Sequence, residues 1–119
     1  MAGRLNPFMA IYWQDFEKVE MRVGRIVEVS DFPEARKSAF RLKIDFGPGV
    51  GVKQTSAQIT KLYSKDELAG RQVVAVVNFP PKQVGKFMSE VLVLGAVCAN
   101  DETILLQPER DAPLGKRIA

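Results

Sequence analysis

The alternation of apolar and charged side chains between residues 40 and 46 restricts the fold of this chain more than any other feature. The apolar positions are Phe40, Leu42, Ile44 and Phe46, and the charged positions between them are Arg41, Lys43 and Asp45. Successive side chains of a β-strand point to opposite faces, so this spacing predicts a strand with one buried and one solvated face. A turn at residues 47–49 and a second alternating run at 50–56 complete a predicted hairpin.

Further strands are predicted on both sides of this hairpin. Residues 21–29 are rich in valine and isoleucine, and Gly24 in their middle predicts a bulge or a sharp bend. Residues 72–79 are a run of valines that ends at two prolines, and proline cannot donate to a strand ladder, so a buried strand is predicted there. The weaker alternation at 87–94 and the short run at 103–107 predict two later strands.

Two short segments have helical spacing instead. The apolar side chains between residues 13 and 19 lie three apart, which predicts an N-terminal helical turn that Asp15 is able to cap. Between residues 58 and 70, Ser64 and Glu67 have the spacing of a capping box. A helix or two short turns are therefore predicted before the valine-rich strand.

The order of these elements predicts the fold class. Three strands, a helix and two strands follow one another, as in the five-stranded OB barrel, in which a helix covers one end. We therefore predict an all-β fold with a short helix: a five-stranded OB-fold barrel (βββαβ) with an N-terminal helical turn and a C-terminal strand extension. The 119 residues, 46% of them hydrophobic, suit one domain with one core.

The residue types that are absent argue against catalysis. Histidine is missing, which removes the commonest general base and every Ser-His or Cys-His nucleophile pair. Cys98 is the only cysteine, so the chain has neither an internal disulfide nor a recognisable zinc-ligand set. Asp45 and Glu90 are the conceivable acid–base pair, and nothing in the sequence brings them together. We expect no enzyme, no metal and no cofactor, and a cytoplasmic location.

The ends of the chain carry no sign of membrane insertion. No apolar run approaches the roughly 18 to 20 residues of a membrane helix, and the N-terminal segment lacks the apolar core of a signal peptide. Met9 is an alternative start to Met1, and the sequence leaves this choice open. We therefore expect no membrane partner.

Basic residues gather in two places, although the net charge is only +3. The first cluster spans residues 33–43 and contains Arg36, Lys37, Arg41 and Lys43 against one carboxylate, Glu34. A solvated face and a phosphate-binding face explain this cluster equally well. In the second, Lys82, Gly85 and Lys86 form a predicted loop between two barrel strands, where basic side chains can hold a phosphate backbone or simply solubilise a turn.

Three segments of the chain resemble the tRNA-binding domain family: DFEKVEMRVGRIVEVSDFPEAR, LKIDFG and LAGRQVVAVVNFPPKQVGKFMSEVLVLGA. This likeness covers about residues 15–96, and it implies an OB-fold barrel and tRNA as a partner. Within the family, DFPEAR, KQTSAQIT and LLQPERDAPLGKRI are most similar to the CsaA proteins, described as export-related chaperones. That likeness covers about residues 16–118.

The resemblance implies an RNA-contacting surface. The residues that map onto it are Lys53, Gln54, Asn78, Lys82, Lys86, Met88, Ser89 and Glu90. The lysines would neutralise phosphates, Gln54, Asn78 and Ser89 would form hydrogen bonds, and Met88 would pack against a base or sugar. Glu90 would orient its neighbours or accept from a base. The family often reads SEGM at this point, whereas two apolar residues follow the SE pair here, so RNA affinity or specificity is expected to differ.

The CsaA likeness also implies a homodimer, formed through N- and C-terminal extensions of the barrel. Phe8, Ile11, Tyr12 and Trp13 form an apolar stretch, and residues 104–106 give the last strand two apolar faces. On the residues alone, packing within one chain explains them equally well. A dimer would suit the bent shape of tRNA. An apolar groove between subunits would instead hold unfolded or precursor polypeptides, which is the alternative function.

Overall fold

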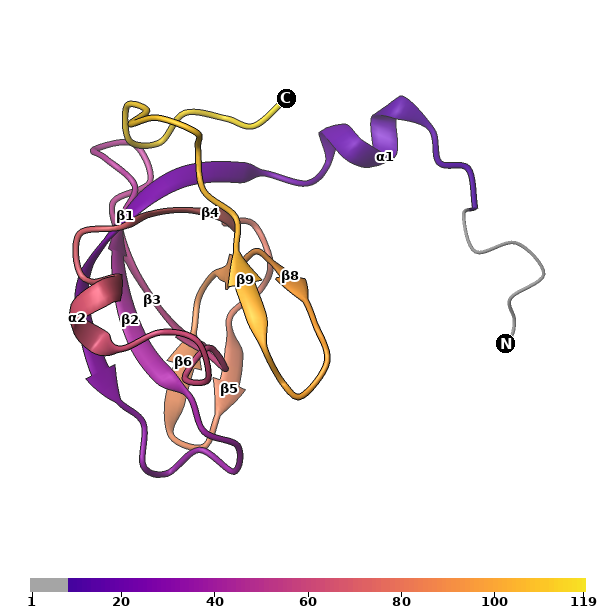
Figure 1. The fold of residues 1–119 in the computed structure, drawn as a ribbon. Helices are drawn as coiled ribbons and strands as arrows, with labels where there is room; N and C mark the ends of the chain where they lie inside the picture. Colours follow the sequence, from indigo (N-terminus) through magenta and orange to yellow (C-terminus); the bar gives the residue numbers. More distant parts are fainter. Residues whose placement is uncertain (1–8) are drawn as a thin grey trace.

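The computed structural model describes residues 9–119, so Phe8 of the predicted apolar stretch lies outside the described residues. Its antiparallel main sheet has five strands in the order β3-β2-β1-β4-β7 (Figure 1). The elements in chain order are α1 (Trp13–Glu17), β1 (Met21–Asp31), β2 (Phe40–Asp45), β3 (Val52–Ala57), α2 (Lys65–Leu68), β4 (Gln72–Val76), β5 (Lys82–Val84), β6 (Phe87–Ser89), β7 (Leu92–Val93), β8 (Gly95–Val97) and β9 (Thr103–Leu105).

Strand β2 confirms the alternation that the sequence predicts. Phe40, Leu42 and Ile44 are buried, whereas Arg41 and Lys43 lie on the other face. The following turn closes with a hydrogen bond from the Gly51 N–H to the Gly47 carbonyl (2.7 Å). Strand β3 begins only after that turn and pairs with β2 along its whole length.

The bulge in β1 is not at Gly24, as the sequence suggested. The register with β2 shifts between Ile26 and Glu28, so Val27 is the extra residue. Gly24 pairs regularly with β4 and has no room for a side chain, because a Cβ there would lie 2.5 Å from Ile44 Cγ2 and 2.7 Å from the Phe46 ring. Its role is to let two core side chains pack directly against the backbone.

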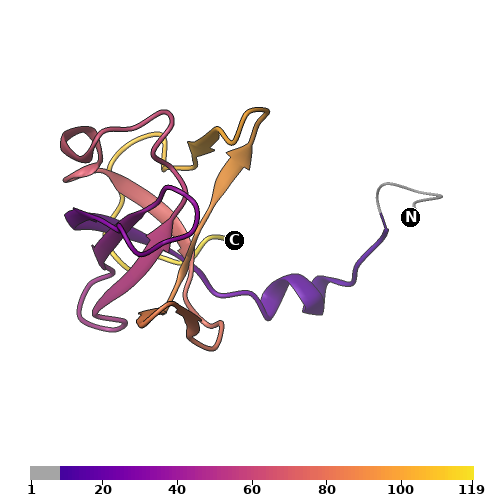
Figure 2. The same cartoon turned by 90° about the horizontal axis from the view of Figure 1, so that it is seen from below.

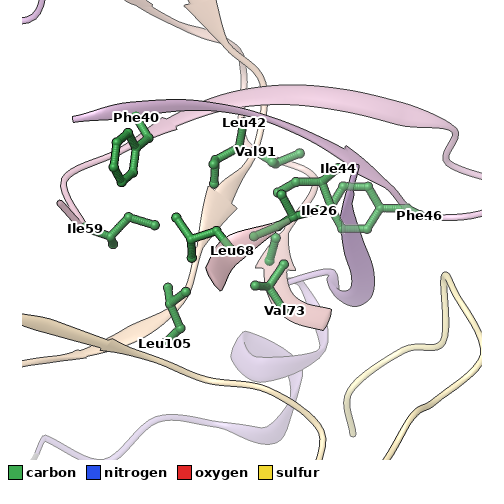
Figure 3. Close-up of a cluster of buried hydrophobic side chains, with 11 residues drawn as sticks. Ile26, Phe40, Leu42, Ile44, Phe46, Ile59, Leu68, Val73, Val91 and Leu105 are labelled. Carbon is green, nitrogen blue, oxygen red and sulfur yellow. The ribbon is translucent and has the colours of Figure 1, made fainter. Parts of the chain in front are cut away.

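The core lies inside the curved sheet and is covered at one end by α2. Every residue of β4 is buried, as expected for its run of valines. Figure 3 shows side chains of several strands meeting Leu68, which comes from α2 and is fully buried. The predicted capping box begins α2: the Ser64 N–H donates to Glu67 Oε1 (2.9 Å), and the Glu67 N–H donates to Ser64 Oγ (3.2 Å).

Strand β3 meets the end of β6 and the two residues that follow it along a seam, residues 54–56 against 88–91, which nearly closes the barrel. The Glu90 N–H donates to the Gln54 carbonyl, and the Gln54 N–H donates to Glu90 Oε1, both at 2.9 Å. The Thr55 hydroxyl donates to the Val91 carbonyl (2.6 Å) and lies 2.8 Å from Ser89 Oγ. The predicted five-stranded OB-fold barrel with a short helix is thereby confirmed.

Two hairpins outside the main sheet differ from the predicted strands. Residues 82–86, expected as a loop, contain β5, which pairs with β6 around a turn at Gly85. The predicted strand 87–94 is divided into β6 and β7. The late strand β9 is present, and its partner β8 was not predicted.

The C-terminal segment returns across the barrel and adds to the edge of β1. The Val23 N–H donates to the Lys116 carbonyl (3.0 Å), and the Gly115 N–H donates to the Val23 carbonyl (2.8 Å). The buried Gln72 side chain donates to the Ala112 carbonyl (2.7 Å) and accepts from the Ala112 N–H (2.9 Å). These contacts bind the segment to both β1 and β4.

The N-terminal arm, residues 9–17, projects away from the barrel in both views (Figures 1 and 2). It contains the predicted helical turn as α1, in which the Asp15 carboxylate accepts from the Tyr12 N–H (3.0 Å). None of the residues of α1 is buried. Trp13 and Phe16 pack against each other, with ring centroids 5.4 Å apart.

Candidate nucleic-acid interface

The outer face of β1, β2 and β3 carries rows of polar side chains. In one row the register places Lys43 directly between Glu28 and Gln54. In the next row Arg41 lies between Ser30 and Ser56. Directly opposite residues on neighbouring strands have side chains close enough to act on one ligand.

A groove with a volume of about 270 Å³ lies on this face, beside the β5–β6 hairpin. Its lining residues are Glu28, Ser30, Arg41, Leu42, Lys43, Gln54 and Phe87. The lining therefore combines two cations, one carboxylate, two neutral polar side chains, an aromatic ring and the buried Leu42. Basic and stacking groups together are what an OB-fold uses to hold nucleic acid.

Aromatic packing fixes one wall of the groove. The Phe87 ring lies 5.4 Å from the ring of the buried Phe32, tilted by 59°. The Arg41 guanidinium lies over the Phe32 ring at 5.5 Å, and its Nε donates to the Asp31 carbonyl (3.2 Å). The Arg41 head is therefore held in place from one side.

Salt bridging in the groove is weak. Lys43 Nζ lies 3.8 Å from Glu28 Oε1, and about half or more of each side chain is exposed, at 53% and 60%. Exposed pairs of this kind contribute about 0–1 kcal/mol. Both groups remain available to a ligand.

Three of the predicted RNA-contacting residues form hydrogen bonds across the seam through their side chains. Gln54 donates through Nε2 to the Met88 carbonyl (2.9 Å), and Ser89 and Glu90 bond to β3 as described above. Gln54 alone of these three also lines the groove. Lys53 does not share that face: it is paired with the buried Ile44, and alternation along β3 directs it away from the side on which Gln54 lies.

Asn78 is separate from the seam and lies at the end of β4. Its side-chain oxygen accepts from the Glu20 N–H (3.0 Å), and its Nδ2 donates to the Lys18 carbonyl (2.8 Å). Arg117 contacts Glu20 Oε2 (3.0 Å) and donates to the Glu17 carbonyl (2.7 Å). We call the contacts of Asn78 and Arg117 with residues 17–20 the clasp. Both side chains hold the base of the N-terminal arm.

The β5–β6 hairpin carries Lys82, Lys86 and Met88. Lys82 pairs with Ser89 and Val84 with Phe87, so these side chains share one face of the hairpin, while Met88 shares the other face with Gln83. Lys82 and Lys86 are exposed, and within residues 9–119 no carboxylate lies within salt-bridge distance of either.

The apolar side chain that the hairpin contributes to the groove is therefore Phe87, which the sequence analysis does not predict. Adjacent residues on a strand point to opposite faces, so the pairing register of the hairpin determines whether Phe87 or Met88 faces the groove. Arg41 and Lys43 were recognised as a basic cluster but were not assigned to RNA. Their alternation with buried residues already placed them together on the outer face of β2.

A second cavity, of about 390 Å³, lies between the end of α2 and the C-terminal segment. Its charges largely neutralise one another: Arg25 contacts Asp111 Oδ2 (3.1 Å), and Arg110 contacts Glu109 Oε1 (2.6 Å). Hydrogen bonds from the backbone and side chain of Ser64 lower the pKa of the nearby Glu67 below its usual value. Its lining holds three cations and three carboxylates, whereas the groove holds two cations and one carboxylate.

The described residues meet neither the requirements of a metal site nor those of a membrane-spanning helix. Within residues 9–119, histidine, cysteine and carboxylate side chains nowhere cluster in threes as a metal ion would require. The helices in the same part of the chain are also too short to cross a membrane.

Comparison with known proteins gives consistent matches. The family described as "Putative tRNA binding domain" matches residues 21–117. The structure of the chaperone CsaA from Bacillus anthracis is 49% identical with a TM-score of 0.89, and covers 93% of this chain and 100% of its own. The CsaA chaperone protein from Picrophilus torridus is 55% identical with a TM-score of 0.86, and covers 92% and 100%.

A longer relative shares the same region. The methionine–tRNA ligase of Thermococcus onnurineus is 38% identical over 108 residues, which is 91% of this chain and 14% of the ligase. The chain thus spans only a small part of the curated ligases that it matches.

Proposed function

The chain belongs to the tRNA-binding domain family, and from this premise we propose that it is a non-catalytic cytoplasmic protein that binds tRNA. The observation that carries this proposal is the groove on β1, β2 and β3, where Arg41 and Lys43 lie beside the Phe87 ring. Cations neutralise phosphates, and an aromatic wall accepts a base. The exposed, unpaired Cys98 is compatible with a reducing compartment.

The β5–β6 hairpin would extend the interface beyond the groove. Lys82 and Lys86 are exposed on the hairpin that forms the wall of the groove, so a backbone leaving the groove would meet them. Lys53 would add charge from the other face of β3. In this proposal Gln54, Ser89 and Glu90 act first as the structural seam, and Asn78 acts on the arm.

The test is a fluorescence anisotropy titration with total tRNA and with an unstructured RNA of equal length, at low and near-physiological salt. We expect tighter binding to tRNA, weakening as salt rises, because neutralised phosphates release counterions. Lys86→Glu should weaken binding and lower the salt slope by about one for each phosphate that the variant no longer neutralises. Lys61→Glu, an exposed lysine outside the groove, is the matched control. Equal affinity of the two variants would refute the hairpin's role.

The exposed side chains of the N-terminal arm support a homodimer. Their exposed fractions are 84% for Met9, 67% for Ile11, 78% for Tyr12 and 65% for Trp13. Apolar surface of this kind marks an interaction site, and the arm and C-terminal segment meet at the Arg117 clasp. Sedimentation should give twice the chain mass, and Ile11→Asp should shift the protein to single chains.

A second candidate function is the binding of unfolded or precursor polypeptides, as an export-related chaperone. It is favoured by exposed apolar side chains on and next to the β8–β9 hairpin, namely Val97 (87% exposed), Ile104 (50%) and Leu106 (48%). Suppression of aggregation of a denatured client should then survive high salt and Lys86→Glu, and should fall in Ile104→Ser. A protein that fails to suppress aggregation at an equimolar ratio would exclude this function.

A further inference from the structure

Phe32 begins the loop between β1 and β2, and its ring is buried apart from the main core. Only 5% of the residue is exposed, although it does not belong to the hydrophobic core cluster of the described residues. Surface loops seldom bury a large aromatic side chain unless the ring has a contact of its own to make. The contacts of Phe32 are therefore informative about its role.

The ring of Phe32 contacts two side chains of the groove. The Phe87 ring lies at a centroid distance of 5.4 Å and a tilt of 59°, which is within the range of favourable aromatic pairs. The Arg41 guanidinium lies over the Phe32 ring at 5.5 Å, within the reach of a cation–π contact. Both partners line the groove, whereas Phe32 does not. Phe32 thus lies behind the groove and connects its aromatic wall to one of its two cations.

The backbone around Phe32 is itself restrained. Pro33 follows it, and a proline confines the preceding residue to extended conformations. The Ala35 N–H donates to the Phe32 carbonyl (3.1 Å), which closes a turn directly after the ring. The ring therefore starts from a fixed point at the end of β1.

Arg41 is held by this loop without being neutralised by it. Its Nε donates to the Asp31 carbonyl (3.2 Å), while the Asp31 carboxylate is bound by Lys65 Nζ (3.0 Å). Among residues 9–119, no salt bridge involves Arg41. The guanidinium is thus oriented by a ring face and a carbonyl, and its charge stays available to a phosphate.

Phe32 also holds the β5–β6 hairpin, which is not part of the main sheet. The bonds of Met88 and Ser89 across the seam fix the hairpin at the end of β6. Phe87 is the residue of β6 closest to the turn at Gly85, and its ring lies on Phe32. The hairpin therefore has a second point of attachment nearer its turn.

We propose that Phe32 is a positioning residue for tRNA: its ring orders the Arg41 guanidinium for a phosphate and the Phe87 ring for a base. This role rests on the proposed tRNA binding and adds to it a residue that does not line the groove. Side chains that are ordered in advance lose less conformational entropy when the ligand binds. Leucine at this position would fill part of the volume but has no π face for a cation.

The first test is a fluorescence anisotropy titration of Phe32 variants with total tRNA. Phe32→Leu should weaken binding at least about threefold, and Phe32→Tyr, which keeps the ring face, should stay within about twofold of the unmodified protein. The control is Phe46→Leu, a buried core ring outside the groove, which should lower the urea midpoint and leave the affinity unchanged. Equal losses of affinity in Phe32→Leu and Phe46→Leu would reject the positioning role.

Double-mutant cycles separate positioning from an independent effect on packing. Phe32→Leu should weaken binding by a smaller factor in the Arg41→Ala background, and also in the Phe87→Ala background, than in the unmodified protein. Factors that simply multiply in both cycles would overturn the inference.

A measurement on the unmodified protein needs no variant to fold. NMR relaxation of the arginine Nε–H groups should show Arg41 ordered on the picosecond-to-nanosecond scale and the exposed Arg36 of the same loop mobile. An Arg41 side chain as mobile as that of Arg36 would overturn the inference. If the unmodified protein binds tRNA and no Phe32 variant changes the affinity, the positioning role is rejected and the proposed function stands. A protein that binds no tRNA would reject the proposed function itself.

Discussion

The N-terminal arm and strand β4 are both rich in apolar side chains, and they differ completely in burial. All residues of β4 are buried between β1 and β7, whereas Met9 and Trp13 of the arm are 84% and 65% exposed. The core reaches from β1 to β9 without a single residue of the arm. Hydrophobic composition alone therefore does not tell whether a segment is buried within its own chain.

The means of attachment differ as well. Strand β4 is held by ladders on both edges, by the packing of Val73 and Ala75 in the core, and by the bonds of Gln72 to Ala112. Within the described residues, the arm is held at its base, where Asn78, Arg117 and the Val77 N–H bond to residues 17–20. A segment anchored in this way keeps its direction while its apolar side chains stay available.

The largest expected effect tests whether the arm is independent of the core. Ile44→Ala should lower the free energy of unfolding by about 2–5 kcal/mol, because Ile44 is fully buried and the cavity cannot collapse easily. Ile11→Ala should change it by less than about 0.5 kcal/mol. Urea denaturation at a concentration where single chains dominate measures both. Similar losses in the two variants would mean that the arm packs on the barrel.

A smaller effect should follow from removing the side-chain contacts of Asn78 at the base of the arm. Asn78→Ala removes two hydrogen bonds, each worth about 0.5–1.5 kcal/mol, and should free the arm more than it destabilises the barrel. Trp13 is the only tryptophan, so the decay of its fluorescence anisotropy reports the mobility of the arm alone.

Gln58→Ala, at an exposed position, serves as the control for this experiment. If Asn78→Ala weakens RNA binding and leaves the mobility of Trp13 unchanged, Asn78 contacts RNA directly, as the family resemblance implies.

The smallest expected effect concerns the cap of α2, the helix that covers one end of the core. In α2 the bonds from Ser64 lower the pKa of Glu67 below 4.5, so their contribution to stability is present above pH 4.5 and is lost as the pH falls through the lowered pKa. Ser64→Ala should raise this pKa toward its usual value, as seen by NMR titration of the Glu67 carboxyl. Ser38→Ala is the control, and an unchanged pKa in Ser64→Ala would contradict the cap's role.

The sequence predicts secondary structure best where the local spacing of residues is sufficient to determine it. The alternation of residues 40–46 gives β2 and the faces of its side chains, and the spacing of Ser64 and Glu67 gives the start of α2. It predicts secondary structure worst where pairing between strands that are distant in sequence determines the geometry. The bulge lies at Val27 because of the register with β2, whereas Gly24 is required for packing against Ile44 and Phe46.

The candidate site shows the same limit. The alternation along β2 predicts which face of the sheet carries Arg41 and Lys43. Strands β5 and β6 have three residues each, so alternation along them is too short to predict which side chains face the groove. Whether Phe87 or Met88 enters the groove depends on the pairing of the hairpin. Similarly, only the folded chain shows that Asn78 contacts residues 18 and 20.

The seam of the barrel has a consequence for how the molecule opens. It is held largely by side chains such as Thr55, Ser89 and Glu90 instead of a continuous ladder, so it should be the first part of the sheet to exchange its amide hydrogens. Gln54 belongs to both the seam and the groove. A ligand that binds only the closed form therefore protects the seam in proportion to its concentration, and hydrogen exchange at Gln54 and Glu90 becomes a measure of occupancy.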